Sequence, residues 1–232
     1  MNEVVVIVGA GVAGINAATK LIDNNYKGKI KIIDMGKNPY DRLPEEVMTG
    51  MLGAGGWSDG KLTYHTSIGG QLSKYCGDEK AMELMDQVIN NFKRFHPKPE
   101  EVQCSNPVAE PDFIKPYFGL RLFPVWHVGT DYLHEIGKNW YNYLKDNGVE
   151  FYWEWRVKEI DFKTNNLTMT SEKYLQMDDD WIFFDKLIFG VGKSGIDFGK
   201  SLAEKYKLPT EPKSVQIGVR FEAPQKHFQK LI

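Results

Sequence analysis

The chain opens on an unbroken run of β-branched residues. Residues 3–8 read EVVVIV, a pattern typical of a strand that is buried on both faces of a parallel sheet. Apolar residues then recur at helical spacing over 12–23, and an Asn-Asn pair follows as a stop signal. A second strand is expected at 29–34, which reads KIKIID. Together these segments predict one βαβ unit, whose crossover is right-handed almost without exception.

Two longer amphipathic helices are expected further along the chain. Apolar residues keep helical spacing over 78–96, and again from Thr130 or Asp131 to the Asn-Gly pair at 147–148. Between 36 and 77 this periodicity is lost and glycine accumulates, which predicts a long functional loop. The stretch 97–129, rich in proline and aromatic residues, either lines a pocket or covers the sheet.

Short β-type runs dominate the chain after residue 148. They predict an antiparallel meander, then a further buried strand, and finally a strand near the C-terminal end. The expected strands are 149–155, 157–162, 167–170, 181–184, 186–189 and 215–221.

These elements predict an α/β fold: a Rossmann-like parallel sheet with an antiparallel β meander and a loop-rich insertion. We expect one discontinuous nucleotide-binding domain over 1–232. Its parts are a core made of 1–77 and 149–200, a helical and Pro-rich insertion at 78–148, and the start of a substrate-side region at 201–232.

Composition narrows the functional classes. Hydrophobic residues make up 42% and charged residues 26%, the balance of an ordinary globular protein. A net charge of −2, with scattered Lys and Arg, offers no footprint for a polyanion, so no nucleic-acid partner is expected. No export signal precedes the first strand, and no run approaches the ~20 apolar residues that cross a bilayer. We therefore expect a cytoplasmic protein with no membrane partner.

The two cysteines carry little of the expected chemistry. Cys76 and Cys104 are too far apart for a CxxC redox pair or a zinc knuckle. We expect inert buried thiols and no metal site.

The motif GAGVAG at 9–14 follows the first strand directly and opens the first helix. Gly9 permits a tight turn, Gly11 lets the backbone approach a pyrophosphate, and Gly14 lets helix and strand pack closely. The helix N-terminus offers free N–H groups and partial positive charge to that pyrophosphate. Asp34 closes the second strand, 20 residues after Gly14, where its carboxylate can bind ribose hydroxyls. A bound dinucleotide is therefore expected.

Three features favour FAD over NAD as that dinucleotide. Ala18 and Leu21 extend the motif to the longer form found in FAD-containing reductases. Asp34-Met35-Gly36 resembles the acidic end of their second strand. Arg42 follows where such proteins often place an arginine.

A second glycine-rich segment, GAGGWSDGKL, covers residues 53–62. Such a density of glycine lets the backbone lie close to a flat ligand, with N–H groups available to a flavin edge or to phosphate. A flexible surface loop is the alternative explanation.

Several ordered segments resemble a known family. GGWSDGKL (55–62), HVGTDYL (127–133), FGVGKSG (189–195) and IGVRFEAPQ (217–225) follow GAGVAG in the order found in uncharacterised bacterial FAD-dependent dehydrogenases, often labelled NAD(FAD)-utilizing. The resemblance spans nearly the whole chain. It implies that 53–62 lies beside the flavin, that Gly190 and Gly192 lie at the cofactor, and that Val157 holds the adenine through its backbone. Lys193 departs from the pattern, because relatives commonly carry histidine there.

Motif and resemblance together give one set of expected FAD-binding residues. The set is Gly9, Gly11, Val12, Ala13, Gly14, Asp34, Met35, Gly36, Arg42, Gly55, Gly56, Ser58, Asp59, Gly60, Lys61, Val157, Gly190 and Gly192. No catalytic residue is identified. His127 is either structural or a proton-transfer group, and Lys61 either stabilises reduced flavin or is a solvated lysine.

Two functions fit this set. The first is an FAD-dependent oxidoreductase, a reductase or dehydrogenase, that acts on an unidentified small molecule. The alternative is a catalytically incomplete FAD-binding module that a second polypeptide completes. Relatives continue beyond the equivalent of Ile232, which is the basis of the alternative and of the expectation that this chain alone binds FAD less tightly.

Overall fold

A computed structural model describes residues 3–106, 119, 122–171, 173, 179–211, 224 and 226. The strand expected at 215–221 and, apart from residue 224, the segment 217–225 lie outside the described residues.

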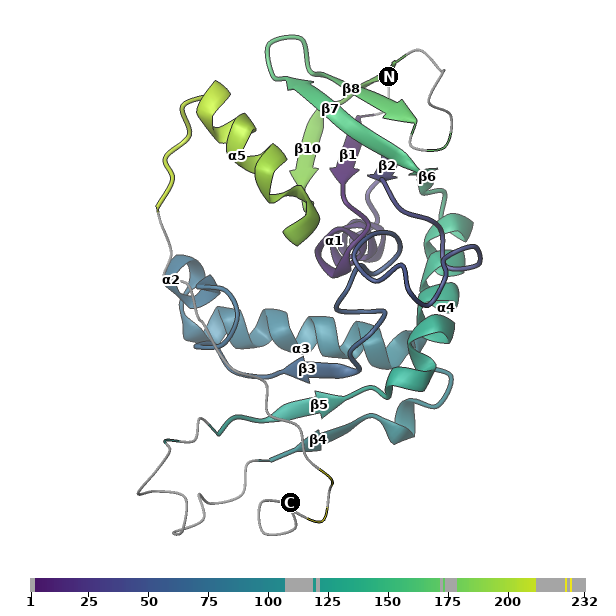
Figure 1. The fold of residues 1–232 in the computed structure, drawn as a ribbon, viewed down its shortest axis with the longest axis vertical. Coiled ribbons are helices and arrows are strands. Elements are labelled where there is room, and N and C mark those ends of the chain that lie inside the picture. The colour runs from purple at the N-terminus through teal and green to yellow at the C-terminus, as the bar shows by residue number, and fades with distance from the viewer. Residues whose placement is uncertain are drawn as a thin grey trace.

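A four-stranded parallel sheet forms the centre of the molecule (Figure 1). Its strand order is β10-β1-β2-β6, and every neighbouring pair is parallel. The helix α1 connects β1 to β2, which confirms the predicted βαβ unit. The bounds are β1 Val4–Val8, α1 Val12–Asp23, β2 Lys29–Asp34, β6 Glu150–Trp153 and β10 Lys186–Phe189.

Two three-stranded antiparallel sheets accompany the parallel sheet. The predicted meander is present, with order β7-β8-β9 and an irregularity in β7 between Val157 and Glu159. The other sheet has the order β3-β5-β4 and lies beyond α3 in Figure 1. The bounds are β7 Trp155–Asp161, β8 Asn166–Ser171, β9 Asp180–Phe183, β3 Lys61–Thr63, β4 Gln103–Ser105 and β5 Val125–His127. The predicted α/β class, a parallel sheet with an antiparallel meander, is confirmed.

The helices agree with the predicted periodicity, with two differences. The stretch expected to be a loop, 36–77, contains the strand β3 and the short helix α2. The helix expected from Thr130 begins with one 3-10 turn, which follows Gly129 at φ +73. None of the helices in the described ranges is long and apolar enough to cross a membrane. The bounds are α2 Leu72–Cys76, α3 Asp78–Phe95, η1 Pro99–Glu101, η2 Thr130–Tyr132, α4 Leu133–Asp146, η3 Lys193–Gly195 and α5 Ile196–Lys205.

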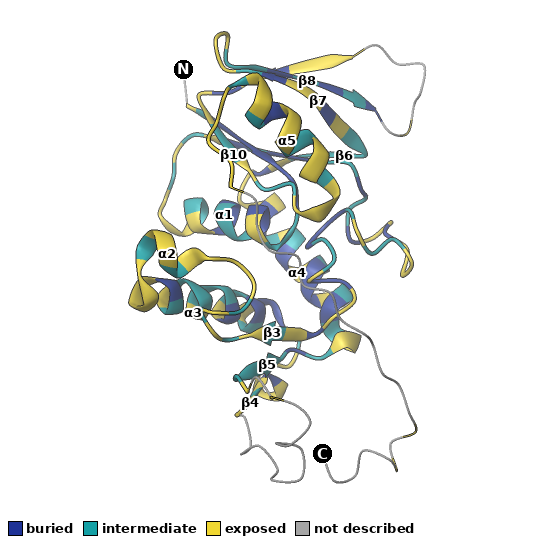
Figure 2. Cartoon of the chain, turned by 60° about the vertical axis from the view of Figure 1, so that its left-hand side comes forward, coloured by how far each residue is buried: buried dark blue, intermediate teal, exposed yellow. Residues whose placement is uncertain are grey.

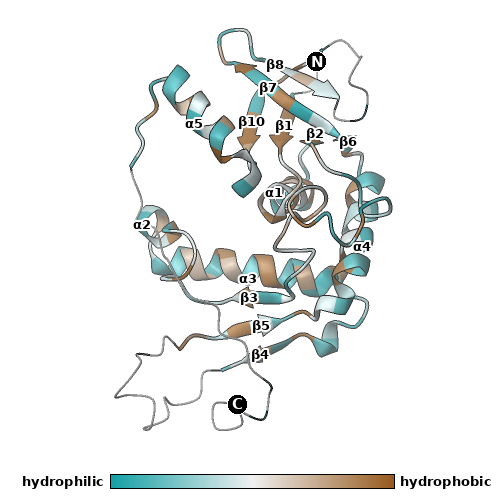
Figure 3. Ribbon diagram, in the orientation of Figure 1, coloured by the Kyte–Doolittle hydropathy of each residue, from teal (hydrophilic) through white to brown (hydrophobic). Residues whose placement is uncertain are grey.

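Both faces of the parallel sheet are buried, as the unbroken hydrophobic run predicts. Val5 and Ile7 belong to one core cluster with residues of α1, α3 and α4, whereas Val6 and Val8 belong to a second cluster with residues of the meander and α5. Dark blue, which marks buried residues in Figure 2, and brown, which marks hydrophobic residues in Figure 3, are both seen on these central strands. The sheet is therefore the middle layer of three.

Trp140 joins three helices in the larger core. Its ring stacks on Phe95 at 4.9 Å and meets Phe92 edge-on at 5.4 Å. Its indole Nε1–H donates to the hydroxyl of Thr19 at 2.7 Å, and that hydroxyl donates to the carbonyl of Ile15 at 2.9 Å. All polar atoms of this buried pair are thus satisfied. Helices from the predicted insertion 78–148 therefore share a core with α1, while the domain division itself stays a prediction.

The Trp140–Thr19 hydrogen bond gives a test of this packing. Thr19→Val keeps the shape of the side chain but leaves the buried indole N–H without a partner, which costs about 1–3 kcal/mol. We expect urea denaturation to show that loss in the free energy of unfolding. Thr19→Ser keeps the hydroxyl and should retain most of the stability. Equal stability of Thr19→Val and the wild type would contradict the role of this bond.

Candidate functional site

A cavity of about 920 Å³ lies at the carboxyl ends of β1, β2 and β10. This is the position at which open α/β sheets bind ligands. Separate parts of the chain form its wall: the turn after β1, the end of β2, the loop 48–55, the start of β7, and the connection from β10 to α5.

The three motif glycines have different surroundings. A Cβ on Gly9, whose φ is +103, would lie 2.4 Å from the carbonyl oxygen of Gly190, and a Cβ on Gly14 would lie 2.0 Å from that of Gly9. Gly11 differs, because its φ of −66 suits any residue and nothing lies within 4 Å of the position of its Cβ. The space at Gly11 therefore belongs to the cavity, whereas the other two glycines serve the packing of the chain.

The N-terminus of α1 faces this cavity. Gly11, Val12 and Ala13 line the wall, and the first intrahelical bond runs from Ile15 N–H to the Gly11 carbonyl at 3.0 Å. Within the described residues, no side chain caps this end and its first turn carries no acidic residue. Such an end is suited to an anionic group.

The carboxylate of Asp34 binds the backbone at three points. Its Oδ2 accepts the N–H of Ala10, and its Oδ1 accepts those of Gly36 and Gly50, all at 2.8 Å. Asp34 also lines the cavity. From the sequence we expected this carboxylate only to bind ribose hydroxyls. In the structure it also links the turn after β1 to the loop that follows β2.

The glycine-rich segment 53–62 divides between the cavity and the protein interior. Leu52 pairs with Gly11, and its N–H donates to the Ala10 carbonyl at 2.8 Å, so Gly53, Ala54 and Gly55 line the cavity. The amides of Gly53 and Gly56 donate to carbonyls of the same loop, Gly50 at 2.9 Å and Leu52 at 3.2 Å. The N–H groups of Gly53 and Gly56 are therefore not available to a ligand, and the part of the segment at the cavity contributes to its wall.

Other members of this segment do not line the cavity. A Cβ on Gly56 would lie 2.4 Å from the Cβ of Leu52, and one on Gly60 would lie 2.6 Å from the N of Thr130, so both glycines allow close packing. Ser58 and Asp59 are exposed. Lys61 is exposed on β3, opposite His127 on β5.

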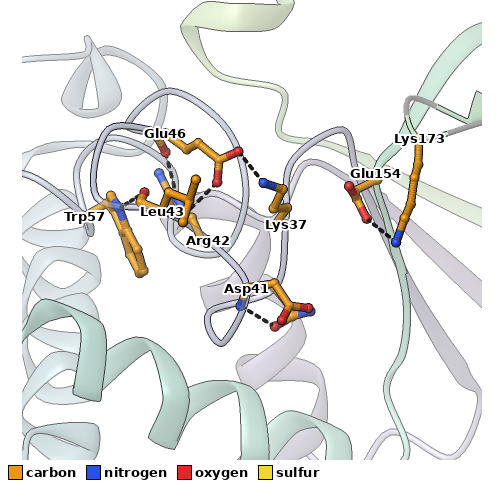
Figure 4. Close-up of polar contacts among 9 residues, drawn as sticks. Lys37, Asp41, Arg42, Leu43, Glu46, Trp57, Glu154 and Lys173 are labelled. Atoms are coloured by element: carbon orange, nitrogen blue, oxygen red, sulfur yellow. Dashed lines mark hydrogen bonds and ion pairs between the residues drawn. The ribbon is translucent and has the colours of Figure 1, made fainter.

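Arg42 lies within the loop that follows β2 (Figure 4) and does not line the cavity. Its guanidinium donates to the carbonyl oxygens of Glu46, Val47, Met51 and Gly53, and burial lowers its pKa to about 10. We expected Arg42 to contact the cofactor, but its guanidinium is already hydrogen-bonded to backbone carbonyls. Gly36 likewise does not line the cavity. A Cβ there would lie 2.2 Å from the N of Gly50, so this glycine allows close packing.

The remaining expected residues are brought together. Of the expected set, those that line the cavity are Gly9, Gly11, Val12, Ala13, Asp34, Met35, Gly55, Val157, Gly190 and Gly192. Those that do not are Gly14, Gly36, Arg42, Gly56, Ser58, Asp59, Gly60 and Lys61.

Sequence reasoning missed part of the wall. Met48, Thr49 and Gly50 lie in an aperiodic loop that carries no motif, whereas Lys193 and Ser194 follow Gly192 and could have been found by extending that motif. Arg156 and Lys158 flank Val157 on β7. Asp34 is the one acidic side chain among the described lining residues, against the three basic side chains of Arg156, Lys158 and Lys193. Although Lys158 pairs with Asp179 at 2.9 Å, this balance favours an anionic ligand.

Trp57 packs the glycine-rich segment 53–62 against α4. Its ring stacks on His134 at 3.8 Å between centroids, Arg42 lies over the ring at 4.3 Å, and its Nε1–H donates to the Leu43 carbonyl at 3.2 Å. Burial first, and then the positive charges of Lys138 and Arg42, lower the pKa of His134.

Comparisons with known proteins give only distant matches. No family model matches the chain. An uncharacterized protein of Clostridium beijerinckii is 25% identical over 233 residues, which cover 95% of this chain and 36% of that protein. The chain therefore spans little more than a third of this relative.

Among solved structures, the chain is similar to a flavoprotein/dehydrogenase from Cytophaga hutchinsonii and to THI4 from Thermovibrio ammonificans. The first is 17% identical with a TM-score of 0.48, over 91% of this chain and 43% of that chain. The second is 13% identical with a TM-score of 0.47, over 89% and 62%. Similarities this distant do not assign the chain to a family.

The Trp57–His134 stack should make the stability of the fold depend on pH. Because the folded state lowers the pKa of His134, it disfavours the charged ring, so stability present at higher pH is lost as the pH falls below the unfolded value of about 6.5. His134→Phe keeps a ring for the stack and cannot titrate. We expect its urea midpoint to fall less than that of the wild type between about pH 8 and pH 5. Parallel pH profiles for the two proteins would contradict this account.

Proposed function

We propose that this chain binds FAD in the cavity at the carboxyl ends of β1, β2 and β10, and that it is a flavin-dependent oxidoreductase for a small molecule. One observation carries the proposal. Gly11 stands at the N-terminus of α1 where neither its backbone angle nor any neighbouring atom calls for glycine. The absence of a side chain there leaves room for a pyrophosphate to approach the backbone.

The surrounding residues fit the other parts of a dinucleotide. Gly11, Val12 and Ala13 would hold the pyrophosphate at the uncapped helix end. The remaining lone pair on Asp34 Oδ2 would accept a ribose hydroxyl, and Val157 would contact the adenine. Segments 53–55 and 190–192 would lie along the flavin. The cavity volume falls within the ~300–1,000 Å³ typical of cofactor sites.

FAD supplies the electron-transfer chemistry when it is bound. The chain contributes binding, orientation and exclusion of water. Phe189 and Phe198 line the cavity with apolar surface, and Lys193 adds a positive charge beside Gly192. Such a charge stabilises negative charge that develops on a neighbouring ring.

The second candidate is a flavin-binding module that a second polypeptide completes. The observation that favours it is exposed apolar surface at the cavity: Met48 is 47% and Phe189 39% exposed in the wall, and Ile196 is 61% exposed nearby. Reduction of bound flavin by NADH or NADPH in the chain alone would favour the enzyme. Failure with every donor, together with flavin binding, would favour the module.

The absorbance spectrum and mass of the small molecule that copurifies with the chain test the proposal directly. We expect FAD, or binding of added FAD in calorimetry. Tight binding of NAD by a sample with no affinity for FAD would contradict the proposal.

Gly11 and Gly14 give a sharper test because they differ in packing. We expect Gly11→Val to leave the fold intact and to weaken FAD binding by about tenfold or more, since its side chain enters the cavity. Gly14→Val should instead destabilise the fold, because its Cβ would clash with the Gly9 carbonyl. Calorimetry with FAD and circular dichroism of both variants measure the contrast. Unchanged affinity in folded Gly11→Val would show that the turn is only structural.

A further inference from the structure

The two ends of the loop 36–53 lie against each other just after β2. A Cβ on Gly36 would lie 2.2 Å from the N of Gly50, and one on Gly50 would lie 2.6 Å from the carbonyl oxygen of Lys37. Met51 N–H also donates to the Lys37 carbonyl at 3.2 Å. Glycine at 36 and 50 is therefore what allows the two ends of the loop to touch.

Asp34 binds both ends of this loop with one oxygen. Its Oδ1 accepts the N–H groups of Gly36 and Gly50, and its Oδ2 accepts that of Ala10 in the turn beside the cavity. Hydrogen bonds to a charged acceptor are the stronger class. A single carboxylate thus fixes the loop base against the turn that opens α1.

Arg42 fills the inside of the same loop. Figure 4 shows its side chain within the coil of the loop, next to Glu46. Within the described part of the chain, its side-chain hydrogen bonds go to the backbone carbonyls of Glu46, Val47, Met51 and Gly53, and its guanidinium lies over the ring of Trp57. The nearby carboxylate of Glu46 is bound instead to Lys37 at 2.6 Å and to the N–H of Leu43 at 2.8 Å.

These contacts hold the segment that forms the cavity wall. Residues 48–50 and 52–55 line the cavity, and both Gly50 and Gly53 bind directly to Asp34 or Arg42. All of these contacts are made by residues of the chain itself, so they can hold the wall without help from a ligand. Preorganisation of this kind raises affinity by removing the cost of ordering a loop during binding.

We propose that Asp34 and Arg42 are positioning residues that hold the 36–53 loop in its binding shape in the cofactor-free chain. The importance of that shape for FAD rests on the proposed function. Arg42 then acts on the cofactor only through the loop, whereas Asp34 holds the loop and keeps one lone pair for a ribose hydroxyl.

The test uses Arg42→Lys and Asp34→Asn in the cofactor-free chain. Chymotrypsin suits it, because Tyr40, Leu43 and Met48 lie in the loop, are exposed, and are untouched by either substitution. We expect cleavage in the loop to accelerate by about tenfold or more, since local opening controls proteolysis of a folded chain. Cleavage at the buried Phe92 of α3 reports global unfolding and should stay slow. Arg94→Lys and Asp23→Asn are matched controls, because these two exposed side chains pair with each other at 3.0 Å, outside the loop.

FAD and ADP titrations complete the test. We expect affinity for both to fall in the variants whose loops open, and to stay unchanged in the two controls. Normal loop protection with lost affinity would overturn the proposal, because it would make these residues direct ligands. Unchanged protection and unchanged affinity would also overturn it. If the wild type binds no FAD, the proposed function fails, and the cleavage rates alone still judge whether Asp34 and Arg42 hold the loop.

Discussion

The close approach of three backbones at the end of β1 is the constraint on which the site depends. Gly9 lies against the carbonyl of Gly190, and Gly14 lies against the carbonyl of Gly9, so the turn, the helix α1 and the end of β10 meet with no side chain between them. This contact aims the N-terminus of α1 along the carboxyl edge of the sheet. The rest of the cavity wall is built outward from that fixed point, because Leu52 pairs with Gly11 and Asp34 binds Ala10.

Two buried or half-buried charges of opposite sign stabilise this wall without pairing with each other. Asp34 accepts backbone N–H groups, and Arg42 donates to backbone carbonyls, so peptide dipoles solvate each charge. A buried charge is tolerable when hydrogen bonds replace its hydration. These hydrogen bonds hold an aperiodic loop that has no backbone hydrogen-bond ladder of its own.

Local periodicity and spacing were enough to predict the elements that build the fold. The runs at 3–8 and 29–34, the helix at 12–23 and the meander strands follow from burial patterns that neighbouring residues reveal. Gly11 and Asp34 could be placed at the cavity because the mechanism of the motif fixes their spacing. Arg42 could not, since its partners are carbonyls of an aperiodic loop whose path no local pattern records. Gly56 and Gly60 show the same limit, because a glycine for chain packing and a glycine for a ligand look alike in a sequence.

The wall draws on segments that are far apart in the chain, so a ligand in the cavity couples them. Gly11, Gly53, Val157 and Gly190 belong to four different parts of the sequence and face one space. A ligand that binds this assembled space binds the folded chain and not the unfolded one, so its binding free energy adds to the stability of all four segments together. The exposed apolar residues Met48 and Phe189 lie in the same wall, on the loop and at the end of β10. A ligand that covers both residues therefore contacts the loop and the end of β10 together.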